Sequence, residues 1–494
     1  MMDLTSRPHM SILRTLQLLI QRGGWDNTRV DDNNYRAEAS STSSNALPKI
    51  ATTPLSTATL ENNEINLTTK RASGYIDPEN EHLTNKSVTC MIKKREIGPG
   101  FNAGQKCRIY SNFLPNRMIP VAVYNSRAFC GSYSVDGKLL VTASQDNSLR
   151  IYNTQDGEFH EYKKILAQNV SWSILDTAFS PDGNYIAYSS WSDALYLCSI
   201  YGDSSVQEAL PLAPTDFGRF CVFSLVFSSD GREILGAAND GCLYIYDREC
   251  HQPAIRIKGH ADDVNAVAFA DNTSQILYSG GDDGLCKVWD RRTLNEVNPH
   301  PVGVLAGHMD GITFVDPRGD GRYLLTNSKD QSIKLWDVRA FSSKDAQANS
   351  RKAVANQDWD YRWHTHVPKQ LYTSTSLLEG DTSIMTYRGH MVVQTLIRCH
   401  FSPAATTGQR YIYTGCGHGR IVIYDLLTGS IVKTLEGHEG CVRDVSWHPY
   451  HQEIISTSWD GVIGCWRYFS QYSDTGIVDS EWGDISDPNW RNPD

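Results

Sequence analysis

The sequence predicts an all-β protein whose main body is a β-propeller of seven four-stranded blades. Three observations support this fold class. A pattern recurs at intervals of about 42 to 48 residues, and each copy ends with an apolar alternation that runs into an aromatic residue in all but one case. The composition includes 12 Trp and 24 Tyr, which suit pleated and half-buried surfaces. A chain of 494 residues is long enough to close such a ring.

The two ends of the chain are predicted to lie outside the ring. Residues 1–26 are expected to form a short amphipathic helix, because Ile12, Leu13, Leu16 and Leu19 fall on one helical face. We expect this helix to dock on a partner; the alternative is a mitochondrial presequence, given the nearby arginines. Residues 27–97 are polar and rich in Ser and Thr, which predicts a disordered linker. Residues 471–494 are predicted to be an acidic, mobile tail.

Three copies of the repeat are complete. Each has a Gly-His pair, then a Ser or Thr, an Asp four residues later and a Trp six residues after the Asp. The four side chains are His260, Ser279, Asp283 and Trp289 in one copy, His308, Thr326, Asp330 and Trp336 in the next, and His438, Ser456, Asp460 and Trp466 in the last. This pattern resembles the WD-repeat family over residues 105–470. The resemblance implies a buried hydrogen-bonded chain from Asp to His to hydroxyl to indole, so these residues are expected to be structural.

Four weaker copies complete the set of seven blades. They end at Tyr152, Cys198, Tyr246 and Tyr424. The interval between Trp336 and Tyr424 is almost twice the others and leaves an eighth blade as an alternative. Residues 340–386 lack a copy of the pattern, so we interpret them as an insert within a propeller that spans residues 98–470. A closed ring has no free strand edge, and the segment 107–124 is the candidate for the strand that closes it.

Composition and motifs exclude several classes of function. The net charge of −10 and the pI near 5.8 argue against a nucleic-acid partner, and the longest apolar run near the start is too short to cross a membrane. The 12 Cys form no CxxC pair, so we expect neither zinc nor another metal, and a reducing compartment, nucleus and cytoplasm.

No catalytic motif or cofactor-binding motif is present, so we expect no cofactor and no enzyme activity. The pairs Asp262-Asp263 and Asp282-Asp283 fall at predicted turns, where Asp bonds local backbone. The alternative of an enzyme on a propeller would have to use His364 and His366, which form the only loose cluster in the insert.

Two consecutive blades predict a docking site for a protein partner. They end in Trp289-Asp290-Arg291-Arg292 and Trp336-Asp337-Val338-Arg339. Residues two apart on a strand point the same way, so each Arg is expected to lie beside the preceding Asp. Equivalent positions in adjacent blades share one face of the ring, so Asp290, Arg292, Asp337 and Arg339 are expected to present two neighbouring guanidinium groups. Arginine suits an interface anchor because its planar fork makes several directed hydrogen bonds.

Paired boxes of this kind resemble those of the WD-repeat substrate receptors of cullin-4 ubiquitin ligases. The runs 287–292, 307–314, 316–323, 358–363, 386–390, 395–399, 443–450 and 458–461 resemble one group of these receptors, the damaged-DNA-binding-protein-1- and cullin-4-associated factor 11 group, also called WD-repeat protein 23. The resemblance implies docking on damaged-DNA-binding protein 1 and presentation of a target protein, of the cap'n'collar type of transcription factor, to the ligase. The alternative is a general WD-repeat scaffold in signalling or chromatin complexes.

Overall fold

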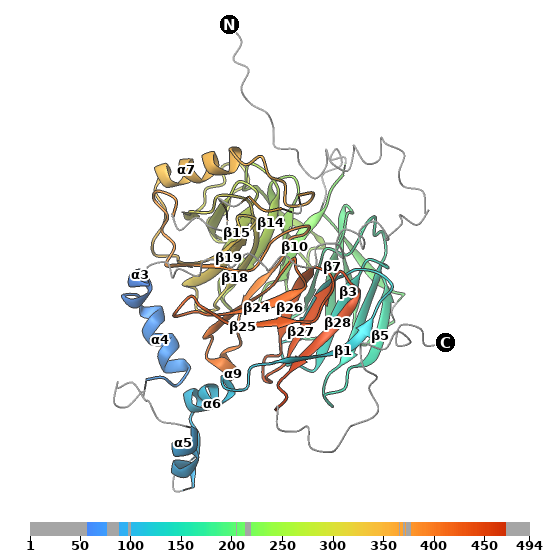
Figure 1. Ribbon diagram of the computed structural model, residues 1–494. Helices are drawn as coiled ribbons and strands as arrows, with labels where there is room; N and C mark the ends of the chain where they lie inside the picture. Colours follow the sequence, from blue (N-terminus) through green and yellow to red (C-terminus); the bar gives the residue numbers. More distant parts are fainter. Residues whose placement is uncertain are drawn as a thin grey trace.

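The computed structural model describes residues 57–76, 88–96, 100–203, 205–212, 219–364, 366–368, 371 and 377–470. Its main body is a ring of seven four-stranded antiparallel sheets, the blades (Figure 1). The first strand of each blade contacts the first strands of both neighbouring blades, so these seven strands surround the axis of the ring. The predicted seven-bladed propeller is confirmed, and the eight-blade alternative is wrong.

Blades 1 to 4 follow one another along the chain, and each begins at the inner strand. Blade 1 contains β2 (Ala128–Tyr133), β3 (Leu139–Ser144), β4 (Ser148–Asn153) and β5 (His160–Leu166). Blade 2 contains β6 (Asp176–Phe179), β7 (Tyr185–Ser189), β8 (Ala194–Ser199) and β9 (Gln207–Pro211). Blade 3 contains β10 (Val222–Phe227), β11 (Glu233–Ala238), β12 (Cys242–Asp247) and β13 (Gln252–Lys258). Blade 4 contains β14 (Val264–Phe269), β15 (Ile276–Gly281), β16 (Leu285–Asp290) and β17 (Gly303–Ala306).

Blades 5 to 7 complete the ring. Blade 5 contains β18 (Ile312–Pro317), β19 (Tyr323–Ser328), β20 (Ser332–Asp337) and β21 (Met385–Arg388). Blade 6 contains β22 (Cys399–Phe401), β23 (Tyr411–Gly415), β24 (Arg420–Asp425) and β25 (Ile431–Glu436). Blade 7 contains β26 (Val442–Trp447), β27 (Ile454–Ser458), β28 (Val462–Arg467) and, from the other end of the chain, β1 (Arg117–Val123).

The ring is closed by β1, which pairs antiparallel with β28. This agrees with the second half of the predicted closing segment 107–124. The prediction of a strand is wrong for the start of that segment, because the residues up to Tyr110 belong to helix α6 (Ala103–Tyr110). Asn102 and Gln105 form a capping box that begins this helix, and Cys107 is buried against the carbonyl groups of α9 (Ala404–Thr407).

The hydrogen-bonded chain expected in the three complete repeats is present in each. In blade 4 the indole Nε1 of Trp289 donates to Ser279 Oγ at 2.9 Å, Oγ lies 2.7 Å from His260 Nε2, and His260 Nδ1 lies 2.8 Å from Asp283 Oδ1. Burial lowers the pKa of His260, so the neutral ring donates from Nδ1 and accepts at Nε2. Blades 5 and 7 repeat the chain with His308, Thr326, Asp330 and Trp336 and with His438, Ser456, Asp460 and Trp466.

The weaker repeats keep the strand geometry but use other polar contacts. In blade 1 the hydroxyl of Tyr124 lies 2.8 Å from Thr142 Oγ1 and 2.6 Å from the hydroxyl of Tyr152, so a tyrosine takes the place of the histidine. In blade 6, His390 Nε2 lies 2.9 Å from Asn327 Oδ1 of the neighbouring blade. Loss of the complete pattern therefore does not open these blades.

The segment before β1 folds onto the ring over part of its length. Helices α3 (Ala58–Glu61) and α4 (Glu64–Ala72) bury Leu60 and Ile65 in a hydrophobic cluster of blades 5 and 6, and α5 (Val88–Arg95) follows. The expectation of a disordered linker over 27–97 is therefore wrong for residues 57–76 and 88–96. These apolar contacts are joined by polar ones, since Asn63 accepts from the hydroxyl of Tyr323 and Arg318 donates to Thr69. Residues 12–19 and the tail 471–494 lie outside the described residues.

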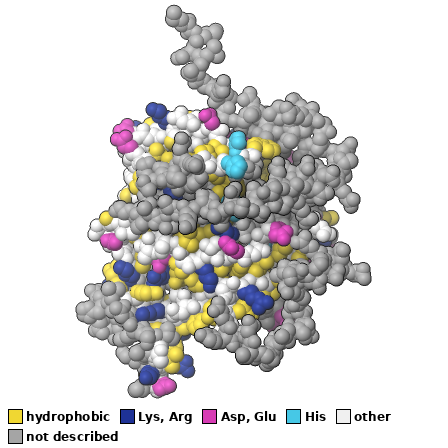
Figure 2. All heavy atoms as spheres, in the orientation of Figure 1, with side chains coloured by type: hydrophobic (Ala, Val, Ile, Leu, Met, Phe, Trp, Pro, Cys, Tyr) yellow, Lys and Arg dark blue, Asp and Glu magenta, His cyan; other side chains and the backbone are white. Residues whose placement is uncertain are grey.

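Helices α4 and α6 also add positive charge to this side of an acidic protein. The last turn of α4 carries Lys70 and Arg71, and α6 carries Lys106 and Arg108. Lys and Arg side chains are visible over this region of the surface in Figure 2. No helix within the described ranges has the length and apolar character needed to cross a membrane.

The predicted insert lies between the third and fourth strands of blade 5 and contains helix α7 (Lys344–Ala355), seen at the top of Figure 1. Ser350 on this helix donates to the carbonyl of His308 at 2.5 Å. Lys334 of β20 binds Asp381 at 2.6 Å, and both side chains are buried. The insert is thus fastened to blade 5. Its predicted boundary at 386 overlaps β21, which begins at Met385 and supplies the fourth strand of that blade.

Candidate protein-docking site

The two predicted boxes form the same turn at the ends of adjacent blades. The backbone N–H of Arg292 donates to Asp290 Oδ1 at 3.0 Å, and that of Arg339 donates to Asp337 Oδ1 at 3.0 Å. Each turn follows the third strand of its blade, β16 or β20, and the two blades have the same strand order and are in contact. Both arginines therefore lie on one face of the ring, called the rim face from here on.

Arg292 is held ready by its own carboxylate. Its Nε and Nη2 bind the two oxygens of Asp290 at 2.9 and 2.7 Å, while the side chain of Arg292 remains 68% exposed. Hydrogen bonds from Arg292 lower the pKa of Asp290, so this carboxylate stays ionised. The expected pairing is present, and it fixes the guanidinium plane without covering it.

Arg339 is exposed, but the expected pairing with Asp337 is not formed. Asp337 instead accepts from Arg322 Nη2 at 2.9 Å and from Asn63 Nδ2 at 3.5 Å, and Arg322 also binds Glu64. The guanidinium of Arg339 makes no hydrogen bond or ion pair with any residue that the structure describes. The sequence could not show this, because Arg322 and the start of α4 reach Asp337 only through the fold.

An open cleft of about 360 Å³ lies beside Arg292, between blades 3 and 4. Arg291 binds Glu233 at 2.6 Å in its wall, and Arg232 binds Glu249 at 3.0 Å with both side chains 62% exposed. Glu249 occupies the turn position in blade 3 that Arg292 occupies in blade 4, with its N–H on Asp247 at 2.8 Å. The positive pair at Arg292 and Arg339 is therefore flanked by a mixed charge pair.

A third run with the same spacing of Trp, Asp and Arg, Trp359-Asp360-Tyr361-Arg362 in the insert, lies away from the rim face. Arg362 Nε and Nη2 bind the Asp360 carboxylate at 2.9 and 2.7 Å, which repeats the geometry of Arg292. Tyr361, however, lies under the ammonium of Lys329 at 4.5 Å, in the turn that begins β20, whereas Asp337 ends that strand. This loop thus belongs to the opposite face, called the insert face.

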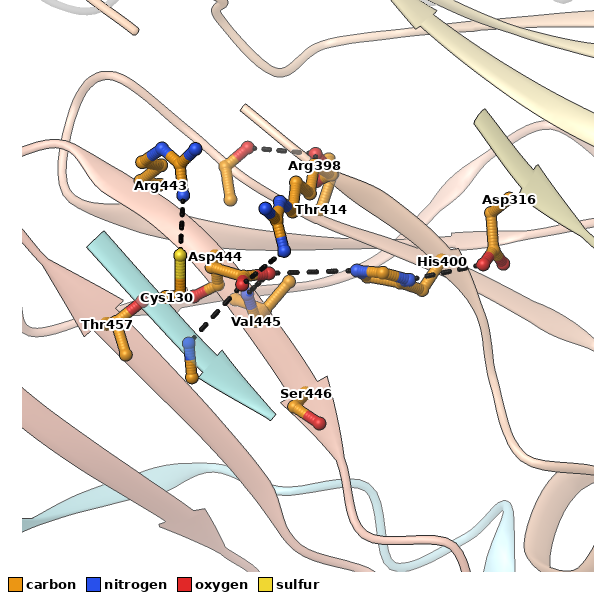
Figure 3. Close-up of polar contacts among 12 residues, drawn as sticks. Cys130, Asp316, Arg398, His400, Thr414, Arg443, Asp444, Val445, Ser446 and Thr457 are labelled. Carbon is orange, nitrogen blue, oxygen red and sulfur yellow. Dashed lines mark hydrogen bonds and ion pairs between the residues drawn. The ribbon is translucent and has the colours of Figure 1, made fainter. Parts of the chain in front are cut away.

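The axis of the ring carries an ion network that the sequence analysis missed. Arg398 binds Asp176 of blade 2 at 2.6 Å and Asp444 of blade 7 at 3.2 Å. His400 lies between Asp316 at 3.3 Å and Asp444 at 3.7 Å (Figure 3). Burial would lower the pKa of His400, but these carboxylates raise it to about 9. The sequence signal that could have predicted this network is the presence of charged residues within otherwise apolar strands.

A second buried arginine adds to this network. Arg443 donates to the carbonyl of Phe129 at 2.6 Å and to that of Leu175 at 2.9 Å, and it lies 3.3 Å from Cys130 Sγ (Figure 3). Burial raises the pKa of Cys130, which argues against a reactive thiolate. Together with the contacts of Arg398 and His400, these contacts bridge blades 1, 2, 5, 6 and 7, so the centre of the ring is structural.

The histidines considered for an enzyme do not assemble a site. His364 Nδ1 accepts from the backbone N–H of Asp360 at 2.9 Å, and both His364 and His366 are exposed. Among the described residues, no three His, Cys, Asp or Glu side chains are grouped to hold a metal ion.

The fold and its repeated turns define a WD-repeat propeller. The family described as "WD domain, G-beta repeat" matches residues 123–153, 251–290, 299–337 and 429–467. The chain is 42% identical over 380 residues to "LEC14B homolog" of Prunus armeniaca, which covers 74% of this chain and 78% of that protein. It is 40% identical over 375 residues to "DDB1- and CUL4-associated factor 11 homolog" of Caenorhabditis elegans, covering 73% and 64% of the two chains.

A second protein of that name, from Caenorhabditis briggsae, is 38% identical over 405 residues, which cover 78% of this chain and 72% of that protein. The chain therefore belongs to the family of the DDB1- and CUL4-associated factor 11 homologs, as its resemblance to the factor 11 group predicted.

Proposed function

We propose that this protein is a non-enzymatic substrate receptor that docks on DDB1, damaged-DNA-binding protein 1, and presents target proteins to a cullin-4 RING ubiquitin ligase. The observation that carries the proposal is the pair of exposed guanidinium groups, Arg292 and Arg339, at equivalent turns of adjacent blades. The names of the two Caenorhabditis relatives, which associate them with DDB1 and CUL4, support it.

The two arginines offer different kinds of anchor. Arg292 is oriented by Asp290, so less side-chain entropy is lost when a partner binds it. Arg339 has all of its guanidinium donors available for a partner, since Arg322 occupies the carboxylate that would otherwise bind it. Helix α4 contacts the same carboxylate through Asn63, so a partner that covers Arg339 lies close to the start of this helix.

Two further features belong to the proposal. The resemblance to the factor 11 group suggests that the target is a cap'n'collar-type transcription factor. The cysteine usage suggests that the protein acts in the nucleus and cytoplasm. The 11 cysteines for which the structure describes the side chain are all free thiols, which is consistent with a reducing compartment. The helix expected in residues 1–26 lies outside the described residues and stays a predicted second contact with DDB1.

A purification that compares two double variants tests the proposal. Arg292→Ala with Arg339→Ala removes the anchors from the rim face. Arg219→Ala with Arg351→Ala is the matched control, because both are exposed arginines outside that face. We expect the first variant to lose DDB1 and CUL4 from the purified complex, measured by mass spectrometry, and the second to retain both. The thermal unfolding of both variants should match that of the wild type.

Retention of DDB1 by the folded Arg292/Arg339 variant would refute the docking role. A wild-type complex without DDB1 and CUL4 would favour the general WD-repeat scaffold instead. The single variants add a further test, because each removes one anchor and should weaken DDB1 binding less than the pair does.

A further inference from the structure

The insert face carries a cluster of acceptor groups between blades 4 and 5. Asp263 precedes β14, Asn265 lies in β14, and Asp282 follows β15. Asp282 Oδ1 accepts from Asn265 Nδ2 at 2.5 Å and from Lys329 Nζ at 2.6 Å, and the N–H of Asp282 donates to the carbonyl of Asp263 at 2.9 Å. Asp263, Asn265 and Asp282 are called the acidic subsite here. The local backbone contacts that the sequence predicted are made by Asp262 and Asp283, which accept from the N–H groups of Asp263 and Leu285 at 2.9 and 3.2 Å; the described carboxylates of Asp263 and Asp282 make none.

Two acceptors in the acidic subsite have no donor. Asp263 is 3% exposed, and its carboxylate makes no hydrogen bond with the described residues. Asn265 is 2% exposed, and its Oδ1 has no partner either. Reversing that amide would not help, since Nδ2 already donates to Asp282 and to the carbonyl of Ile312 at 2.7 Å. A buried acceptor without a donor costs about 1–3 kcal/mol, so native proteins usually satisfy it, and a ligand is one way to do so.

The subsite is also short of positive charge. Lys329 is bound to Asp282 and Arg362 to Asp360, so Asp263 forms no ion pair with the residues that the structure describes, and Asp310 is also buried. Burial, followed by the charge of Asp282, raises the pKa of Asp263 to about 8. Burial raises the pKa of Asp310 to about 7. Both shifts mean that the folded protein disfavours these negative charges, and an added cation would relieve them.

The surroundings indicate which cation fits. A lysine or arginine side chain can bring one positive charge and several N–H donors to acceptors of this kind. The side chain of Asp282 is 20% exposed, which leaves an approach from solvent. The insert places the ring of Tyr361 under the ammonium of Lys329 at 4.5 Å, so an ammonium group is already accommodated in these surroundings. Aromatic faces and carboxylates together favour ammonium and guanidinium groups.

We propose that the acidic subsite binds a lysine or arginine side chain of the target protein. The cation is held by the carboxylates of Asp263 and Asp282 and by Asn265 Oδ1, beside the wall that the insert forms. The inference rests on the proposed function, in which a target is presented to the ligase. Because the subsite lies on the opposite face from Arg292 and Arg339, the target and DDB1 are bound at the same time.

Ligand-observed NMR tests this with three small probes and the full chain. N-acetyl-arginine amide and N-acetyl-lysine amide carry the cation, and N-acetyl-norleucine amide is the neutral control of similar size. We expect saturation transfer to at least one cationic probe and none to norleucine amide. Asp263→Asn should weaken that binding at least tenfold while leaving the shape of the site unchanged. Asp358→Asn, which removes an exposed carboxylate of the insert, should have no effect.

Equal signals from the neutral probe, no signal from either cationic probe, or unchanged binding by Asp263→Asn would overturn the inference. The failure of this inference can be distinguished from that of the docking proposal. Asp263→Asn should still co-purify with DDB1, and the Arg292→Ala, Arg339→Ala variant should still bind the cationic probe. Removing an unpaired buried carboxylate should not lower the melting temperature, which thermal unfolding checks.

Discussion

Replacing Thr326 by Val removes one hydroxyl from the centre of blade 5 and changes little else, because the two side chains have nearly the same shape. Thr326 Oγ1 accepts from Trp336 Nε1 at 2.7 Å and lies 2.6 Å from His308 Nε2. All three side chains are buried at 1% exposure or less. The substitution therefore leaves an indole N–H and an imidazole nitrogen without partners.

The expected cost follows from those two groups. A buried polar group without a partner costs about 1–3 kcal/mol, so the free energy of unfolding should fall by about 2–6 kcal/mol. His308 keeps its contact with Asp330 at 2.9 Å, so the ring is not released and the loss should lie in the lower half of that range. This is a large fraction of the stability of an ordinary domain.

Thr414→Val in blade 6 is the matched control. Thr414 is equally buried, but its hydroxyl donates to the carbonyl of Arg398 at 2.8 Å and touches neither an indole nor an imidazole. We expect it to cost about 1 kcal/mol. Urea unfolding followed by tryptophan fluorescence gives both values. If Thr326→Val were no more destabilising than Thr414→Val, the hydrogen-bonded chain would not be a source of stability.

Three further predictions concern the axis and the N-terminal helices. Nearby carboxylates outweigh burial and raise the pKa of His400 to about 9, so its protonated form stabilises the fold below its unfolded pKa of about 6.5, and this contribution is lost as the pH rises through 9. The urea midpoint of the wild type should therefore fall towards that of His400→Gln over this range, and parallel pH profiles would contradict the prediction. Arg398→Met leaves Asp176 without its cation and leaves Asp444 only the more distant His400, so it should cost about 3–5 kcal/mol in urea unfolding, whereas an unchanged midpoint would show that the ion pairs are dispensable. Ile65→Ala removes a fully buried side chain and should speed amide hydrogen exchange in residues 57–72 while the blades keep their protection; slow exchange in that segment would show that it is held by other contacts.

The sequence predicted the ring because the characteristic residues of each repeat lie at nearly constant separations along the chain. Strand and turn lengths set the positions of His260, Ser279, Asp283 and Trp289 along the chain, so this spacing predicts a four-stranded blade. The exposed turn at Arg292 was predictable for the same reason, since Asp290 is only two residues away.

The sequence did not predict contacts between segments that lie far apart along the chain. Nothing near Asp337 in the chain indicates that Arg322 and Asn63 will take its carboxylate. The polar segment before the ring gave no sign that Leu60 and Ile65 would find a hydrophobic seat on blades 5 and 6. Propensity and composition describe a segment by itself, whereas docking depends on a surface that only the folded ring creates.

The pairing of β1 with β28 affects how the protein is made. β1 leaves the ribosome long before β28, so blade 7 is incomplete until β28 has been synthesised. Until then β1 and the adjoining blades present unpaired edges, which attract other strands and chaperones. A chain that stops before Val462 keeps both boxes at Arg292 and Arg339 but leaves the circle open. Because the pairing of β28 with β1 closes the ring, the rim face belongs to a closed propeller only in chains that contain β28.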